Sequence, residues 1–128
     1  MKKTYRGSCH CGAVRFEADI DLAAGTVKCN CSICAKGRNW LAAVGGDSFR
    51  LISGESDLSD YRFGSKTIGH RFCKHCGMHP YSGNDKFYAV SIACLDDADP
   101  AEIIASPVTW VDGLHDNFKS PPAETRHL

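Results

Sequence analysis

The sequence predicts a mainly β domain with very little helix, and three observations support this prediction. Most apolar stretches are short, and apolar and polar residues alternate along them, as they do in half-buried strands. Only one segment carries a complete helix-start signal. Eight of the 128 residues are cysteines, and seven of these lie in three tight clusters at expected strand turns. The length suits a single domain over residues 1–128.

The expected strands follow one another along the chain. Residues 40–44 and 48–52 flank Gly45-Gly46-Asp47, and this Gly-rich turn predicts a β-hairpin. Residues 87–95 form the longest apolar run, which we expect to be a central strand. The full set of expected strands is residues 13–20, 40–44, 48–52, 60–63, 68–73, 87–95 and 108–111.

The one strong helix signal is Asp99-Pro100-Ala101-Glu102, which is a capping-box pattern with proline at the first helical position. Pro107 limits this helix to about two turns. Residues 120–128 show no periodic pattern, and we expect this tail to be frayed.

The charge and hydropathy of the chain argue against two classes of partner. Lys and Arg number 15 and Asp and Glu number 15, so the formal net charge is zero, which disfavours nucleic acid. No apolar run approaches the ~18 residues of a membrane helix, and the first residues lack the apolar stretch of a secretory signal. We therefore expect a cytoplasmic protein with no nucleic-acid or membrane partner; nothing in the sequence indicates its oligomeric state.

The cysteines carry the functional information. In a reducing compartment, clustered cysteines more often bind metal than form disulfides. Spacings of C-x-C and C-x-x-C let thiolates converge on one ion, and glycine after a cluster suits a tight turn. The clusters are Cys9-His10-Cys11-Gly12, Cys29-Asn30-Cys31-Ser32-Ile33-Cys34 and Cys73-Lys74-His75-Cys76-Gly77. Together they predict two zinc ions per chain.

Seven thiolates are one short of two closed tetrahedral sites, so the way in which they are grouped matters. The simplest grouping joins the first and third clusters into a closed four-cysteine site of Cys9, Cys11, Cys73 and Cys76. It leaves Cys29, Cys31 and Cys34 as a three-thiolate site with one open position. Closed sites are usually structural, and a site with an exchangeable fourth ligand is typical of catalysis.

Other groupings remain open at this stage. Cys9 and Cys11 can instead join the second cluster, because the separation fits a zinc ribbon. Both sites can be purely structural, with Cys94 or a histidine as the eighth ligand, and iron is chemically possible at a four-cysteine site. In the predicted central strand, Cys94 is otherwise expected to be a small buried hydrophobe.

Charges near the second cluster suggest what an open site would take. Two zinc ions and seven thiolates bring the formal charge of the chain from zero to −3, and the three-thiolate site alone carries −1. Neighbouring cations would help such a site to hold an anionic ligand, and Lys28, Lys36 and Arg38 bracket it in sequence. The alternative interpretation is a solvated basic edge. His70 and His79 flank the third cluster and are candidate polar partners of a metal site.

The order C-x-C-G, C-x-C-x-x-C, C-x-x-C-G resembles the glutathione-dependent formaldehyde-activating enzymes and the related centromere-protein-V-like zinc domains. The resemblance covers a core of about residues 7–113. It extends to motifs outside the cysteine clusters: Tyr61-Arg62-Phe63-Gly64, His70-Arg71-Phe72-Cys73, Cys76-Gly77-Met78-His79-Pro80 and Cys94-Leu95-Asp96.

The resemblance implies a fold and an activity. The fold would be a zinc-containing β-tent of packed antiparallel sheets. The four-cysteine site would be structural, and Cys29, Cys31 and Cys34 would hold the catalytic zinc. The family archetype joins glutathione and formaldehyde into S-hydroxymethylglutathione, which is a carbon–sulfur lyase reaction in reverse. One departure is Asn30, which stands where the archetype has histidine.

We therefore expect a zinc-dependent carbon–sulfur lyase-type enzyme whose partners are a small-molecule thiol and an aldehyde. Glutathione is the expected co-substrate, and formaldehyde or a related small aldehyde is the second substrate. Lys28, Lys36 and Arg38 would bind the anionic substrate, and His79 is the candidate proton donor. The alternative hypothesis is a non-enzymatic, zinc-stabilised interaction or scaffold domain.

Overall fold

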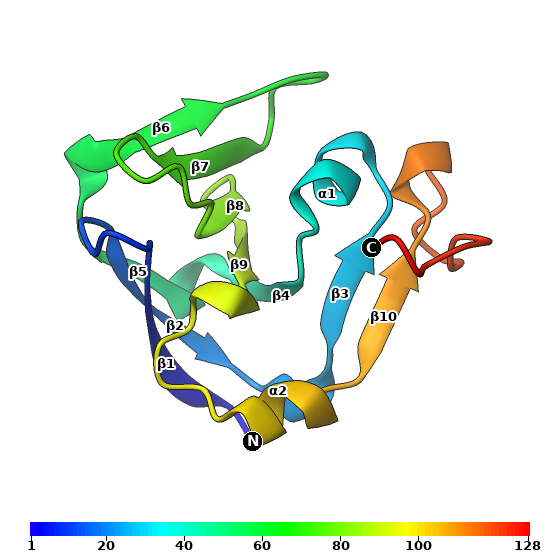
Figure 1. Ribbon diagram of the computed structural model, residues 1–128, viewed down its shortest axis with the longest axis horizontal. Helices are drawn as coiled ribbons and strands as arrows, with labels where there is room; N and C mark the ends of the chain where they lie inside the picture. The colour runs from blue at the N-terminus through cyan, green and yellow to red at the C-terminus, as the bar shows by residue number, and fades with distance from the viewer.

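The computed structural model describes residues 1–128, and its strands form two sheets (Figure 1). The smaller sheet has the strand order β1-β2-β5, and all of its pairs are antiparallel. Its strands are β1 (Lys3–Ser8), β2 (Arg15–Ile20) and β5 (Phe49–Ser53).

The larger sheet has seven strands in the order β10-β3-β4-β9-β8-β7-β6. Its pairs are antiparallel except for β10 and β3, which run parallel. Its strands are β3 (Thr26–Cys29), β4 (Leu41–Gly45), β6 (Leu58–Tyr61), β7 (Gly69–Cys73), β8 (Tyr81–Gly83), β9 (Phe87–Ser91) and β10 (Val108–Val111). Two packed sheets with little helix confirm the mainly β fold that the sequence predicts.

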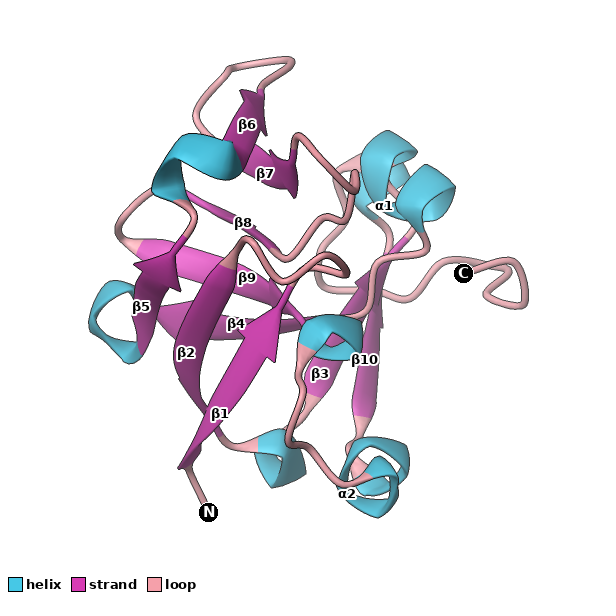
Figure 2. Cartoon of the chain, turned by 60° about the vertical axis from the view of Figure 1, so that its left-hand side comes forward, coloured by secondary structure: helices cyan, strands magenta, loops and turns pink.

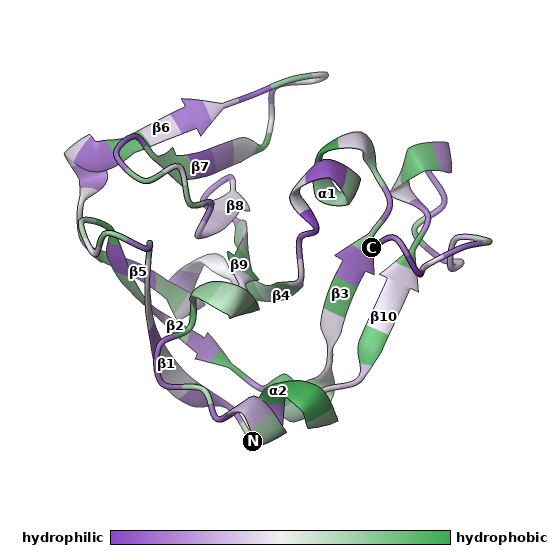
Figure 3. Ribbon diagram, viewed as in Figure 1, coloured by the Kyte–Doolittle hydropathy of each residue, from purple (hydrophilic) through white to green (hydrophobic).

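The hydrophobic core lies between the two sheets. Strand β2 alternates strictly, so that Phe16, Ala18 and Ile20 point inward, as a two-residue period requires. Phe49 of the small sheet stacks on Phe16 at 5.5 Å and contacts Tyr81 of the large sheet at 4.4 Å, measured between ring centroids. Figure 2 shows the small sheet in front of β4 and β9. Figure 3 shows that these two strands are largely hydrophobic, whereas the outer strand β6 is mainly hydrophilic.

The predicted hairpin at residues 40–52 is wrong. Strands β4 and β5 form where they were expected, but they belong to different sheets. The 3-10 turn η2 (Gly46–Ser48) carries the chain from one sheet to the other. A Cβ atom on Gly46 would lie 2.0 Å from the carbonyl oxygen of Asp85, so glycine here permits a close backbone approach rather than a two-residue hairpin turn.

The predicted strand at residues 87–95 is too long. Strand β9 is central in the large sheet, as expected, but it ends at Ser91 and the 3-10 turn η4 (Ile92–Cys94) follows. Ile92 and Cys94 are nevertheless buried, so the apolar run correctly indicated burial but not conformation. Cys94 joins the main core, as expected of a small hydrophobe.

The helices are short. Helix α2 (Pro100–Ala105) confirms the capping box: the Asp99 side chain accepts from the Ala101 amide, and Glu102 accepts from the Asp99 amide.

The sequence did not predict helix α1 (Ser32–Gly37), nor strands β1, β3 and β8. The other 3-10 turns are η1 (Leu22–Ala24), η3 (Glu55–Asp57) and η5 (Gly113–His115). No helix is long and apolar enough to cross a membrane. Residues 120–128 form neither helix nor strand.

Gly54 fixes the chain beside the first cysteine cluster. Its φ is +89°, and an added Cβ would lie 2.3 Å from the carbonyl oxygen of Ala13. Gly64 also has a positive φ, of +60°, but open space surrounds it.

We predict that Gly64→Ala lowers the free energy of unfolding by about 1–2 kcal/mol, which is the left-handed backbone penalty alone. Gly54→Ala should lose a further ~1–3 kcal/mol, because the Ala13–Val14 backbone must also move. Denaturant unfolding of both zinc-loaded variants measures the difference. Equal losses would contradict the steric argument.

Candidate metal centres and the adjoining cavity

Cys9, Cys11, Cys73 and Cys76 form one cluster, which we call the four-cysteine cluster. Their sulfur atoms all lie within 4.8 Å of one another, and the Cys9–Cys11 and Cys11–Cys73 Sγ distances are both 3.6 Å. A disulfide would require about 2.0 Å. Sulfurs around a tetrahedral zinc with Zn–S bonds of ~2.3 Å are about 3.8 Å apart. The spacing therefore fits one shared metal ion.

Backbone turns bring these four sulfurs together. Cys9 follows β1 of the small sheet, and Cys73 ends β7 of the large sheet. Gly12 and Gly77 adopt positive φ values of 83° and 77°, which close the two turns after the cysteines. Hydrogen bonds from the backbone of Cys11 and Met78 lower the pKa of Cys76 to about 6. Such bonds stabilise the thiolate, which is the form that binds metal.

Cys29, Cys31 and Cys34 form the second cluster, the three-cysteine cluster, and their sulfurs also lie within 4.8 Å of one another. Cys29 ends β3, and α1 begins directly after Cys31, so its first turn folds Cys34 back toward the other two. The Cys31 amide donates to the Cys29 sulfur at 3.3 Å. A hydrogen bond with Cys34 lowers the pKa of Cys31 to about 5, and this same interaction raises the pKa of Cys34.

The structure therefore brings the seven cysteines together as the simplest grouping has them. No histidine, carboxylate or further cysteine belongs to either cluster, and Cys94 lies outside both. Each cluster can hold one metal ion, and donor sets made only of sulfur suit zinc. The three-cysteine cluster supplies one ligand fewer than a tetrahedral ion needs, so an ion there would have room for a ligand from outside the chain.

Asn30 fixes one wall of the three-cysteine cluster. Its buried side chain donates from Nδ2 to Asp112 Oδ1 at 2.8 Å, and its Oδ1 accepts from the Leu114 amide at 2.9 Å. These bonds hold Gly113 so close that an added Cβ would lie 2.5 Å from the Cys29 sulfur. The role of Gly113 was not predicted from the sequence, where the Asp112-Gly113 turn after the last expected strand is its only signal.

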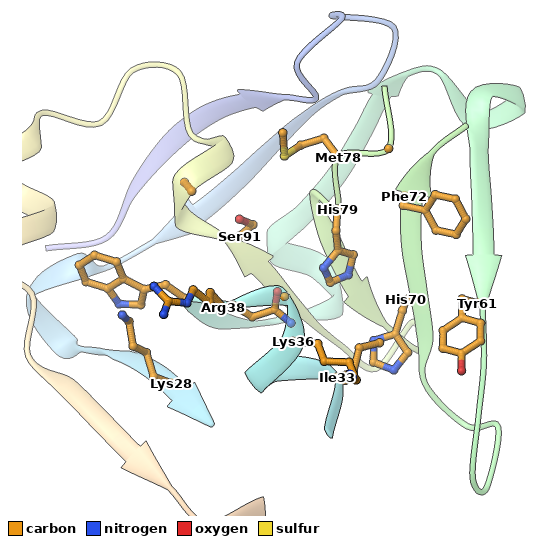
Figure 4. A pocket seen from close by; sticks show the side chains of 15 residues that line it. Lys28, Ile33, Lys36, Arg38, Tyr61, His70, Phe72, Met78, His79 and Ser91 are labelled. Carbon is orange, nitrogen blue, oxygen red and sulfur yellow. The ribbon is translucent and has the colours of Figure 1, made fainter. Parts of the chain in front are cut away.

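A cavity of about 630 Å³ lies beside α1, the helix that carries Cys34 of this cluster. The three residues predicted to bind an anion all line it: Lys28 is half-buried, and Lys36 and Arg38 are exposed (Figure 4). The Lys28 ammonium lies 4.9 Å from the ring of Trp40 and 5.5 Å from that of Trp110, which are cation–π distances. The cysteines themselves do not line the cavity, but Ile33, which lies between Cys31 and Cys34 in the sequence, does.

His70 and His79 line the same cavity, with ring centroids 6.1 Å apart. Nδ1 of His70 and Nε2 of His79 are buried and have no hydrogen-bond partner. Burial lowers the pKa of both rings, and proximity to His70 lowers that of His79 further. The negative charge of Cys31 acts in the opposite direction on His70, which relates this ring electrostatically to the three-cysteine cluster. The lowered pKa favours the neutral form of both rings. These two histidines are half-buried, whereas the other four histidines are exposed.

Comparison with known proteins supports one family. Residues 4–112 match the family described as glutathione-dependent formaldehyde-activating enzyme. The fold resembles the crystal structure of a Rhodobacter sphaeroides protein from the Northeast Structural Genomics programme. The two are 31% identical with a TM-score of 0.71, and the match covers 81% of this chain and 99% of the other.

We predict that Gly113→Ala removes metal from the three-cysteine cluster alone. The added Cβ would displace the Cys29 sulfur, whereas the four-cysteine cluster has no contact with this turn. Zinc per chain should therefore fall from two to one. Leu114→Ala is the matched control, because that side chain is 59% exposed, and it should keep both ions. A Gly113→Ala protein that retains two zinc ions would show that this wall does not constrain the cluster.

Proposed function

Because the chain belongs to the glutathione-dependent formaldehyde-activating enzyme family, we propose that it is a zinc-dependent carbon–sulfur lyase-type enzyme. It would add a thiol such as glutathione to formaldehyde or a related small aldehyde, and release the thiol in reverse. The observation that carries the proposal is a sulfur cluster with three ligands, beside a cavity rimmed by cations.

The two clusters would have different roles. Cys9, Cys11, Cys73 and Cys76 would hold a closed structural zinc, and Cys29, Cys31 and Cys34 would hold the catalytic one. Zinc with an open position lowers the pKa of a thiol that binds it, which generates the nucleophilic thiolate at neutral pH.

The basic residues would select and orient the thiol. Glutathione is an anion at neutral pH, and its carboxylates are natural partners for Lys28, Lys36 and Arg38. Lys28 is the best placed of the three, because the two indole rings hold its ammonium group in one position. This restriction reduces the side-chain entropy lost on binding.

The reaction needs a proton to move from sulfur to oxygen. The C–S bond forms as the carbonyl π bond opens, and the new alkoxide oxygen takes up a proton. His79 is the proposed group for this transfer, because its Nε2 lacks a partner within the protein and lies in the wall of the cavity. Its lowered pKa keeps the ring neutral between turnovers, so it can accept the thiol proton and then donate it.

We predict that Cys31→Ser and Cys76→Ser fail in different ways. Cys31→Ser should keep the fold and one zinc ion but lose thiol binding, because it alters only the open site. Cys76→Ser should impair folding, because it opens the closed site. Zinc content, circular dichroism and zinc-edge absorption with added glutathione measure these outcomes. Retained thiol binding in Cys31→Ser would refute the assignment, and a folding defect equal to that of Cys76→Ser would favour the scaffold hypothesis.

We predict that His79→Gln slows formation of the thiol–aldehyde adduct by about 10²–10⁴-fold, which is the usual contribution of a positioned acid–base group. Glutathione affinity and zinc content should stay unchanged. Exchange NMR between free and adduct glutathione measures the rate. The exposed His127→Gln is the control and should behave as the native protein does. An unchanged rate in His79→Gln would exclude this residue as the proton carrier.

A further inference from the structure

One wall of the cavity carries Tyr61 and His70, which belong to a group of stacked rings that the reaction with formaldehyde leaves without a role. Tyr61, Phe63 and His70 form this ring stack. Tyr61 and Phe63 are 5.8 Å apart and inclined by 23°, and Phe63 and His70 are 5.3 Å apart and inclined by 22°. These are stacked geometries. Tyr61 and His70 are 6.4 Å apart and tilted by 45°. Tyr61 and Phe63 are nevertheless 52% and 41% exposed, so part of their ring surface is uncovered.

The ring stack lies at the end of the β6–β7 hairpin where the loop of residues 62–68 connects the two strands. Tyr61, the last residue of β6, is directly opposite His70 in the strand register. Ile33 and Lys36 of α1 face these rings, and a shallower hollow that contains Phe63 continues the main cavity between the same elements. A flat group placed there would contact rings on one side and the Ile33 side chain on the other.

The opposite end of the cavity is cationic. In Figure 4, Lys28 on β3 lies at one side, Tyr61 and His70 lie at the other, and His79 lies between them. The cavity therefore has a polarity: an anionic group is favoured near Lys28 and a flat apolar group near Tyr61. Formaldehyde contributes one carbon and one oxygen to its adduct and has no surface with which to cover the rings.

Resting on the proposed function, we propose that the preferred aldehyde of this chain is aromatic rather than formaldehyde. The ring stack would take the aryl group, and the thiol part would lie toward Lys28. The thiolate sulfur attacks the aldehyde carbon, the π pair moves to oxygen, and the proton lost by the thiol ends on that oxygen. The product is an aryl hemithioacetal, and no oxidant or reductant is consumed.

Two thioether probes test this preference by binding rather than by turnover. S-benzylglutathione places a phenyl ring where an aryl aldehyde would put one, and S-methylglutathione mimics the adduct of a one-carbon aldehyde. With zinc-loaded protein, titration calorimetry should give a Kd for the benzyl probe that is about tenfold lower than for the methyl probe, the effect of one added aromatic contact.

A double variant, Tyr61→Ser with Phe63→Ser, should bring the two Kd values together while zinc content stays at two. Both side chains are exposed, so the fold should tolerate the change. Ile104→Ser is the control, because this α2 side chain is 81% exposed and does not line the cavity. It should keep the tenfold preference.

The outcomes separate the two proposals. If neither the probes nor glutathione itself binds, the proposed function fails and this inference fails with it. If glutathione binds but neither probe does, the proposed function stands and the aromatic preference is overturned. If both bind equally well, or the methyl probe binds more tightly, the thiol site stands and the aromatic preference is overturned. A benzyl preference that survives in the double variant also overturns the inference, because the ring stack would not be its cause.

Discussion

The convergence of four cysteine sulfurs on one point is the constraint on which the rest of this structure depends. The sulfurs of the four-cysteine cluster lie within 4.8 Å of one another, a distance at which thiolates would repel strongly unless a cation neutralised them. Cys9 belongs to the turn after β1 and Cys73 to the end of β7, so the cluster joins the small sheet to the large one. Cys9, Cys73 and Val14 form a separate small core there. The stability of this junction between the sheets would therefore depend on the metal ion that the cluster can hold.

The four-cysteine cluster also helps to determine where the ring stack lies, because Cys73 and His70 are on the same strand, β7. In the β6–β7 ribbon, Cys73 is opposite Leu58 at one end and His70 is opposite Tyr61 at the other. The four-cysteine cluster fixes the first end, and the register carries that fixed position along the ribbon to the cavity. A metal ion held by this cluster would thus influence the shape of a cavity whose wall contains none of its ligands. The three-cysteine cluster is instead fixed by the first turn of α1, which is local in sequence, and by the Asn30–Asp112 bond, which joins residues 82 positions apart.

Local features were the ones that the sequence could predict. The spacing of the cysteines, the capping box at Asp99 and most strands depend on neighbours in the chain, and they were found. Helix α1 was missed because its six residues are too few to show an apolar period. The hairpin failed because Gly46 serves a contact with residue 85, which is distant in sequence. Gly113 and the ring stack were missed for the same reason, since each acquires its role only when remote segments meet.

The order of strands in the large sheet divides the cavity between two parts of the chain. Strand β3 is second in the sheet and β7 is sixth, so the sheet must curve for Lys28 and His70 to line one cavity, with α1 between them (Figure 1). The cationic end belongs to Lys28 on β3 and Arg38 after α1. The aromatic end belongs to residues 61–72, where neither β6 nor the loop after it carries a cysteine. If the proposed function holds, substitutions in that loop would change which second substrate is accepted without changing any metal ligand, whereas substitutions near Lys28 would alter thiol and metal binding together.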